Sequence, residues 1–225
     1  PKLTKAASLN NTGRLSYMVE TGITLIMIGL TPCALGAMLY NTEIVRLVYE
    51  RGAFDAGATV LTSSALFYYA IGLIFISMNI FLTQTFYADH NMLHPMLCSA
   101  GSLAIKIALN LLLIGPMGHN GLALSTSISS IVNTVLLVAV IKKKRGGLRV
   151  INGSKIFKLA IFSGISVGFS WAVFLAVQKV FPTVAHIDDI ALLSAVLFAG
   201  IIYFLLLWFG KIEEIKMIKN IFIKK

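Results

Sequence analysis

Charged residues are scarce in this sequence, at 12% of its 225 residues, whereas 57% are hydrophobic and the mean hydropathy is +0.86. A soluble domain carries about 25% charged residues, so too few polar side chains are present to coat a globule in water. Among the charged residues, Asp and Glu together are fewer than Lys and Arg, with nine carboxylates. We interpret the adjacent Asp188 and Asp189 as solvated loop charges. No nucleophile–base pair, phosphate-binding glycine loop or HExxH motif is found, so the sequence does not predict an enzyme.

Cysteine and histidine are also rare, with two and four residues, and they form no cluster with the spacing of metal ligands. Cys33 and Cys98 both lie in apolar stretches, and we expect them to be ordinary buried thiols. The sequence therefore predicts no metal site and no cofactor. A disulfide-stabilised scaffold is excluded as well, because two isolated cysteines cannot form such a framework.

Long apolar stretches dominate what is present. A transmembrane helix needs about 20 apolar residues, and six stretches of that length are bounded by polar residues, glycine or proline. They cover residues 21–40, 59–84, 92–114, 121–141, 156–180 and 190–209. Lipid offers no partner for backbone polar groups, so each stretch must be helical. The predicted fold class is an all-α membrane protein with six transmembrane helices.

The positions of lysine and arginine predict the orientation of these helices. Fifteen of the 19 basic residues fall on the side that holds both ends of the chain, and only Arg46, Arg51 and Lys179 fall on the other. Cytoplasmic segments carry the excess of lysine and arginine, so we expect both termini in the cytoplasm. Lys106 is the one basic residue inside a predicted helix. With the chain embedded in a membrane, the net charge of +10 does not indicate nucleic-acid binding.

The segments between the helices complete the predicted organisation. Residues 1–20 form a cytoplasmic lead-in, and 21–141 form four helices with an outer interfacial segment at 41–58. Residues 142–155 form a basic cytoplasmic loop, 156–209 two further helices, and 210–225 a basic amphipathic cytoplasmic tail. Within the outer segment, residues 41–55 mix apolar and charged positions, which indicates a short amphipathic helix followed by a turn at Gly52.

Polar side chains inside the helices are the candidate functional residues, because polar groups in hydrocarbon are costly and face the protein interior. Two readings remain open: they line a cavity, or they join helices through hydrogen bonds. The cavity-face candidates are Asn79, Thr83, Ser99, Ser102, Ser129 and Asn133. On the third helix, Lys106 and Asn110 share the face of Ser99 and Ser102. The last stretch, 190–209, is almost wholly apolar, so we expect it to contact lipid or a lipid ligand.

A family resemblance rests on several ordered motifs. The stretch LVYERGAFDAGAT at 47–59 contains an outer-loop motif formed by Arg51, Gly52, Ala53 and Phe54. ALFYYAIGL (65–73), FYADHNMLHP (86–95) and LNLLLIGPMGHNGLALSTSIS (109–129) follow in order. Together they resemble the MurJ/MviN lipid II flippases of the multidrug/oligosaccharidyl-lipid/polysaccharide exporter superfamily. The match is clear over residues 1–147, and the last two helices fit by position and hydropathy only.

This resemblance implies that the chain is a piece of a fourteen-helix, two-lobed protein, corresponding to helices nine to fourteen. Such proteins flip undecaprenyl-diphosphate-linked peptidoglycan precursor across the bacterial plasma membrane by alternating access, for cell-wall synthesis and cell shape. The implied partners are that lipid, membrane lipids and the missing N-terminal helices. Arginines of those missing helices hold the diphosphate, and the last two helices form a lipid-facing groove.

Some relatives bind sodium at positions that match Lys106, Asn110 and Thr126, but this chain lacks the carboxylate and has an ammonium instead of an amide. We therefore expect Lys106 to occupy the place of sodium. The alternatives are a flippase for another undecaprenyl-linked glycan and a non-transporting membrane scaffold. Arg51, beside Gly52, is expected to cap nearby carbonyls or to pair with Glu50 or Asp55.

Overall fold

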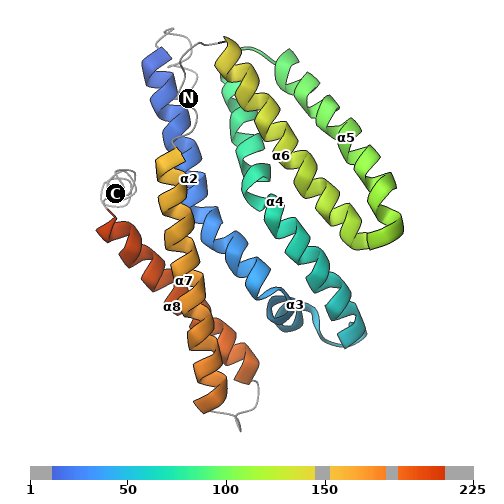
Figure 1. Cartoon of the computed structure of the whole chain (residues 1–225), viewed down its shortest axis with the longest axis vertical. Coiled ribbons are helices and arrows are strands. Elements are labelled where there is room, and N and C mark those ends of the chain that lie inside the picture. Colours follow the sequence, from blue (N-terminus) through green and yellow to red (C-terminus); the bar gives the residue numbers. More distant parts are fainter. Residues whose placement is uncertain (1–11, 145–152, 181–186, 211–225) are drawn as a thin grey trace. The chain divides into compact units, whose positions relative to one another are not determined.

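The structure is a computed structural model that describes residues 12–144, 153–180 and 187–210, and every regular element in these ranges is a helix. The helices are α2 (Thr12–Leu39), α3 (Asn41–Tyr49), α4 (Ala56–Ala88), α5 (Leu93–Met117), α6 (His119–Lys144), α7 (Gly153–Val180) and α8 (Ile187–Phe209) (Figure 1). All except the short α3 are long and apolar enough to cross a membrane. The prediction of an all-α protein with six spanning helices is confirmed.

The helices extend beyond the apolar stretches that predicted them. α2 begins at Thr12, inside the expected lead-in, and α6 continues to Lys144, inside the expected basic loop at 142–155. The physical reason is that hydropathy marks only the part of a helix in hydrocarbon, whereas the helix itself continues through the polar interface. The predicted tail helix lies outside the described residues, apart from Gly210 in a turn.

The outer segment forms the short helix that its amphipathic pattern predicts. α3 covers nine residues, with Val45 buried and the charged Arg46 exposed. The turn after it contains Gly52 with φ +62°, in the left-handed region that a residue without Cβ adopts at little cost. This turn separates α3 from the start of α4.

The chain forms two compact units, and α2 and α4 contribute to both. Unit 1 comprises residues 1–30 and 68–156, and unit 2 comprises residues 31–67 and 157–225. Unit 1 thus holds α5, α6 and the second part of α4. Unit 2 holds α3, α8 and nearly all of α7.

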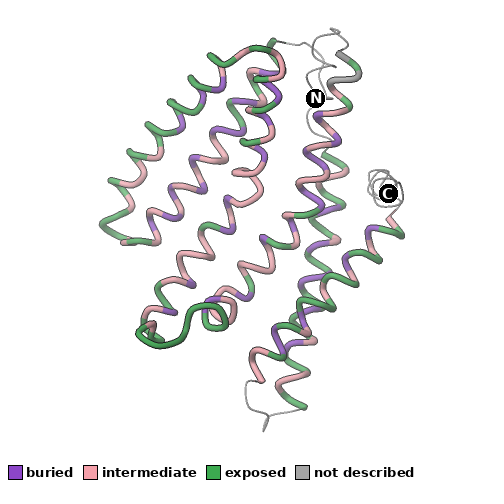
Figure 2. The backbone as a smooth tube through the Cα atoms, turned by 180° about the vertical axis from the view of Figure 1, so that it is seen from behind, coloured by how far each residue is buried: buried purple, intermediate pink, exposed green. Residues whose placement is uncertain are grey.

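Close helix packing organises unit 1. A Cβ on Gly72 of α4 would lie 2.7 Å from Ser127 Cα, so only glycine allows α4 and α6 to approach this closely. α5 and α6 lie side by side and run in opposite directions (Figure 1). Buried residues recur along α6, whereas exposed residues follow most of α5 (Figure 2). α6 is therefore the central helix of this unit.

A small aromatic and aliphatic core organises unit 2. Tyr40, Phe174, Ala191, Leu192 and Ala195 form a buried cluster. Within it the rings of Tyr40 and Phe174 meet edge to face, with centroids 5.5 Å apart, a favoured arrangement for aromatic pairs. The cluster joins the end of α2 to α7 and α8.

Hydrogen bonds satisfy the polar groups at this core. The Tyr40 hydroxyl and Ser170 Oγ are 2.6 Å apart, and Ser166 of α7 donates to the Ala199 carbonyl of α8 at 2.7 Å. Through these bonds Ser166 and Ser170 join α7 to its neighbours.

Candidate functional site

The predicted ion-site residues lie at the contact between α5 and α6 in unit 1. The Asn110 side-chain oxygen accepts a hydrogen bond across this contact from Ser125. Thr126, the predicted partner, donates instead to the Leu122 carbonyl of its own helix at 2.9 Å. Lys106 is half-buried one turn before Asn110. The structure thus brings Asn110 to α6 through Ser125 and does not bring it to Thr126.

The contact between α4 and α6 contains a second set of polar side chains. Asn79 donates to the Ser130 carbonyl at 3.0 Å, and its side-chain oxygen accepts from Thr134 at 2.8 Å. Ser127 donates to the Tyr68 carbonyl at 2.6 Å, next to the close approach at Gly72. Sequence reasoning singled out Asn79 but missed Ser127 and Thr134. Both lie on the face of α6 that packs on α4.

The other cavity-face candidates do not gather at one place. Ser99 is exposed, and Ser102 is buried and donates to the Ser99 carbonyl at 3.0 Å. Ser129 is buried and donates to the Thr126 carbonyl at 3.0 Å. Such bonds to the same helix satisfy a hydroxyl without creating a site.

Asn133 and Thr83 complete the set. Asn133 is buried, and its side-chain oxygen has no hydrogen-bond partner among the described residues. Thr83 is half-buried on α4. Neither residue is joined to the Asn110–Ser125 contact by a hydrogen bond in the described part of the chain.

The outer turn is held by its own backbone and by Arg51. The Arg51 guanidinium donates to the Val48 carbonyl at 2.6 Å, closing the end of α3, and the Arg51 backbone N–H donates to Tyr49 O at 2.7 Å. Of the two roles expected for Arg51, the structure therefore shows the capping of a carbonyl. Phe54 packs on Tyr49 with ring centroids 5.9 Å apart. Gly52 and Ala53 are exposed between them.

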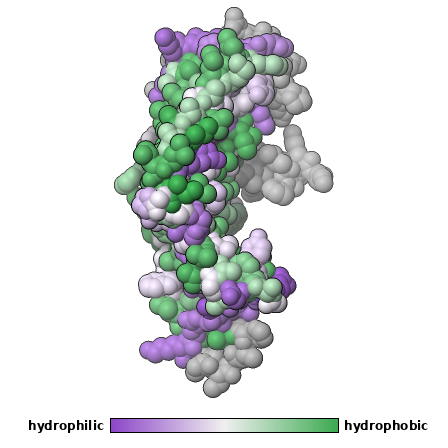
Figure 3. Space-filling model, turned by 90° about the vertical axis from the view of Figure 1, so that its right-hand side faces the viewer, coloured by the Kyte–Doolittle hydropathy of each residue, from purple (hydrophilic) through white to green (hydrophobic). Residues whose placement is uncertain are grey.

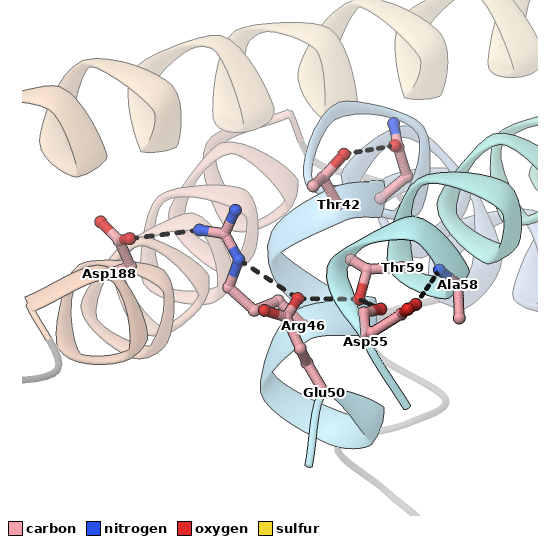
Figure 4. A network of polar contacts seen from close by, with 8 residues as sticks. Thr42, Arg46, Glu50, Asp55, Ala58, Thr59 and Asp188 are labelled. Carbon is pink, nitrogen blue, oxygen red and sulfur yellow. Dashed lines mark hydrogen bonds and ion pairs between the residues drawn. The ribbon is translucent and has the colours of Figure 1, made fainter. Parts of the chain in front are cut away.

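A network of ion pairs and hydrogen bonds surrounds Arg46 in unit 2 (Figure 4). Arg46 of α3 lies 3.3 Å from the Asp188 carboxylate of α8 and 3.7 Å from Glu50. Glu50 in turn accepts a hydrogen bond from Thr59 of α4 at 2.7 Å. Through these contacts α3 is tied to the beginnings of both α4 and α8.

This network corrects the interpretation of Asp188 as a solvated loop charge. Besides pairing with Arg46, the Asp188 carboxylate accepts a hydrogen bond from Gln178 of α7 at 2.7 Å. The physical reason is that an Asp in the first turn of a helix can still face a cation from another element. The feature of the sequence that could have indicated this ion pair is Arg46, a single cation on an amphipathic helix.

An apolar groove of about 360 Å³ lies between α2, α7 and α8 within unit 2. Its walls come mainly from small and aliphatic residues, such as Gly36, Val167, Val196 and Gly200. Pockets of this volume accommodate small ligands in other proteins.

Cys33 lies on the wall of this groove. The expectation of two buried thiols holds for Cys98 and is wrong for Cys33, which is exposed. The small residues Gly36 and Gly200 of the groove wall leave space beside it, so its thiol is not covered.

Comparisons with known proteins agree with this architecture. The family described as "Lipid II flippase MurJ" matches residues 1–209. The "Lipid II flippase MurJ" of Burkholderia cenocepacia is 27% identical over 219 residues, covering 92% of this chain and 41% of that protein. The "Probable lipid II flippase MurJ" of Thermotoga maritima is 31% identical over 134 residues, covering 60% of this chain and 27% of that protein.

A solved structure, "Lipid II flippase MurJ, inward closed conformation", matches 91% of this chain and 40% of its own chain. The TM-score is 0.76 and the sequence identity is 21%, a likeness that shows the fold. The chain thus spans less than half of the length of the relatives that it matches.

Proposed function

This chain belongs to the lipid II flippase MurJ family, and we propose that it is the C-terminal part of a transporter that flips lipid-linked peptidoglycan precursor across the bacterial plasma membrane. Both ends of the described chain then face the cytoplasm, in keeping with the strong asymmetry of lysine and arginine. The complete activity requires the helices that lie outside this chain, because the chain covers 41% of its Burkholderia relative.

The apolar groove of unit 2 is the observation that supports this function most strongly. A carrier of a lipid-linked sugar must move a polar headgroup through the membrane while the apolar tail stays in a hydrocarbon-like environment. The groove between α2, α7 and α8 offers such an environment, since small and aliphatic side chains line it. Exposed Leu197 and Ile201 continue the apolar surface along α8. We assign this groove to the lipid tail.

Unit 1 supplies a contrasting, polar interior. Thr134 donates to the Asn79 side chain, and Asn79 and Ser127 donate to carbonyls across the contact of α4 and α6. A bundle joined in this way can move as a body when the protein alternates between its two openings. We assign to unit 1 the role of a stable framework.

Complementation of flippase-depleted cells tests the proposal. The full-length gene is expressed in bacteria whose own lipid II flippase is switched off, and growth and cell shape are followed. We expect growth to be restored. A matched variant with Gly200→Trp, which fills the groove, is expected to reach the same membrane abundance and to restore growth poorly. Gly168→Trp on the exposed side of α7, where an added Cβ meets nothing within 4 Å and which does not line the groove, is the control for bulk alone.

The outcomes separate the alternatives. Restoration of another undecaprenyl-linked glycan, without rescue of peptidoglycan synthesis, would assign the chain to a different flippase of the superfamily. No rescue of either pathway by an abundant protein would favour a membrane scaffold.

A further inference from the structure

α5 is the least covered of the six long helices. Only 11% of its most apolar stretch is buried, against 33% in α6. Leu103, Ile107 and Leu111 are each more than half exposed, and Leu111 reaches 75%. The side of the molecule that carries α5 presents a largely hydrophobic surface (Figure 3). Lipid or other helices can cover such a surface equally well.

The position of Lys106 indicates whether lipid or other helices cover α5. It lies 13 residues after Leu93 and 11 residues before Met117, which places it about 16–20 Å from either end of α5 at 1.5 Å per residue. The hydrocarbon core is about 30 Å thick, so Lys106 lies near its midplane. A lysine side chain reaches only about 6 Å from its backbone, so its ammonium cannot snorkel to the interface from this depth.

The described part of the chain offers Lys106 no counter-charge. It forms no ion pair or hydrogen bond with a described residue. The described carboxylates lie in α3, in turns or near helix ends, and the nearest to a helix interior, Glu20, pairs with Lys155 at 3.3 Å. A charge at the membrane centre is costly, and such a residue is found paired with another group inside the protein.

The neighbouring polar side chains are engaged elsewhere. Asn110, one turn later on α5, accepts the hydrogen bond from Ser125. The contacts Asn110–Ser125 and Leu113–Gly121 fix the antiparallel register of α5 and α6, and this register places Lys106 at the level of Ser129. Ser129 donates its own hydroxyl hydrogen to the Thr126 carbonyl. Lys106 therefore needs a partner from outside the described chain.

We propose that the part of this protein that lies outside the chain docks on α5, over its uncovered side and the adjoining edge that carries Lys106, and that Lys106 pairs with an aspartate or glutamate of that part. The inference rests on the proposed function, because it takes the chain as one portion of a longer flippase. The Burkholderia relative has more than half of its length beyond the match. That length is ample for helices that cover α5.

Charge complementarity selects a carboxylate within a helix as the partner. Lipid tails can cover the leucines of α5 but cannot neutralise an ammonium. An anionic substrate is present only during part of a transport cycle, whereas Lys106 stays in the membrane throughout. A carboxylate of an adjoining helix is a permanent partner, and it also specifies which helix face docks.

The first test is the sequence that precedes this chain in its gene. It must encode at least one Asp or Glu inside an apolar stretch long enough to span the membrane. A preceding region whose spanning stretches hold no carboxylate overturns the proposal without further work.

The second test measures the thermal stability of the full-length protein in detergent with no lipid substrate. We expect Lys106→Met to leave at least tenfold less folded protein at the midpoint temperature of the wild type, because it strands a buried carboxylate. Lys106→Arg is expected to keep most of the stability. The control is Lys144→Met, whose partner Asp89 lies in a turn 3.7 Å away, and we expect it to change stability little.

Rescue identifies the partner. Each intramembrane Asp or Glu of the preceding helices is replaced by Asn or Gln in the Lys106→Met background, and one of these doubles is expected to regain the stability. If Lys106→Met is as stable as the wild type, or loses affinity for the lipid substrate at unchanged stability, the proposal is wrong. Flipping by the wild type is assayed separately, so a failure of the proposed function would be recognised independently.

Discussion

Adding a single methyl group at Gly72 tests whether α4 and α6 pack as closely as the structure shows. In Gly72→Ala the new Cβ would lie 2.6 Å from Ser127 Oγ and 2.7 Å from Ser127 Cα. The second contact is to backbone, so no side-chain rotation relieves it. The helices must separate by about 0.7 Å to restore an ordinary contact of 3.4 Å. Overpacking of this kind costs about 1–3 kcal/mol.

The same displacement weakens the hydrogen bond from Ser127 to the Tyr68 carbonyl, worth about 0.6 kcal/mol in a membrane protein. Alanine also gains up to about 1 kcal/mol in helix propensity over glycine. Gly168→Ala on α7 is the matched control, because its Cβ would meet nothing within 4 Å and it gains the same propensity. The difference between the two variants therefore isolates packing, at about 2–3 kcal/mol, or roughly 30- to 150-fold in the unfolding equilibrium.

Unfolding of the two variants by SDS titration in mixed micelles measures this difference directly. We expect Gly72→Ala to unfold at a clearly lower SDS concentration than Gly168→Ala. Equal midpoints would refute the close approach of α4 and α6.

Further predictions concern the outer turn, the ion pairs, the topology and the coupling ion. Arg51→Ala should lower the yield of folded protein more than it alters transport, because Arg51 closes the end of α3. Fluorescence-detected chromatography measures the yield, and a flipping assay measures transport. A normal yield with altered substrate affinity would contradict this prediction. A double-mutant cycle of Arg46→Ala and Asp188→Ala should give a coupling free energy of less than about 1 kcal/mol, and this energy should fall at high salt, since both side chains are more than 40% exposed. A large coupling free energy that does not depend on salt would show a buried pair. A cysteine at Ala56 in a cysteine-free background should react with impermeant maleimide in intact cells, and labelling only after lysis would reverse the predicted topology. Flipping by the full-length protein should be independent of a sodium gradient, because Lys106 supplies a fixed cation; a sodium-dependent wild type would exclude that role.

The spanning helices could be predicted from sequence because hydropathy is a local property. Each apolar stretch must be helical in lipid whatever it packs against. The short helix α3 followed for the same reason, since its alternation of Ile44, Val45 and Leu47 with charged residues lies within two turns. The helix ends were predicted less well, because polar residues such as Lys144 continue a helix without a hydropathy signal.

Contacts between helices depend on rotation and register, which the sequence does not specify locally. Ser125 and Thr126 are adjacent on α6, and only the packed geometry decides that Ser125 reaches Asn110. The ion pair of Asp188 likewise depends on Arg46, which lies 142 residues earlier in the chain. The resemblance implies a lipid-facing groove at the last two helices, but the wall that α2 contributes could not be predicted, because α2 is distant in sequence from α7 and α8.

Direct measurement of lipid II flipping by the purified full-length protein tests the central claim most directly. Vesicles with labelled lipid II in both leaflets receive an impermeant reagent that destroys the label in the outer leaflet. With active flippase the account predicts that nearly all of the label becomes accessible, and that the Gly200→Trp variant, with its groove filled, exposes it far more slowly. Accessibility that stays at the outer-leaflet fraction with a folded wild-type protein would contradict the account.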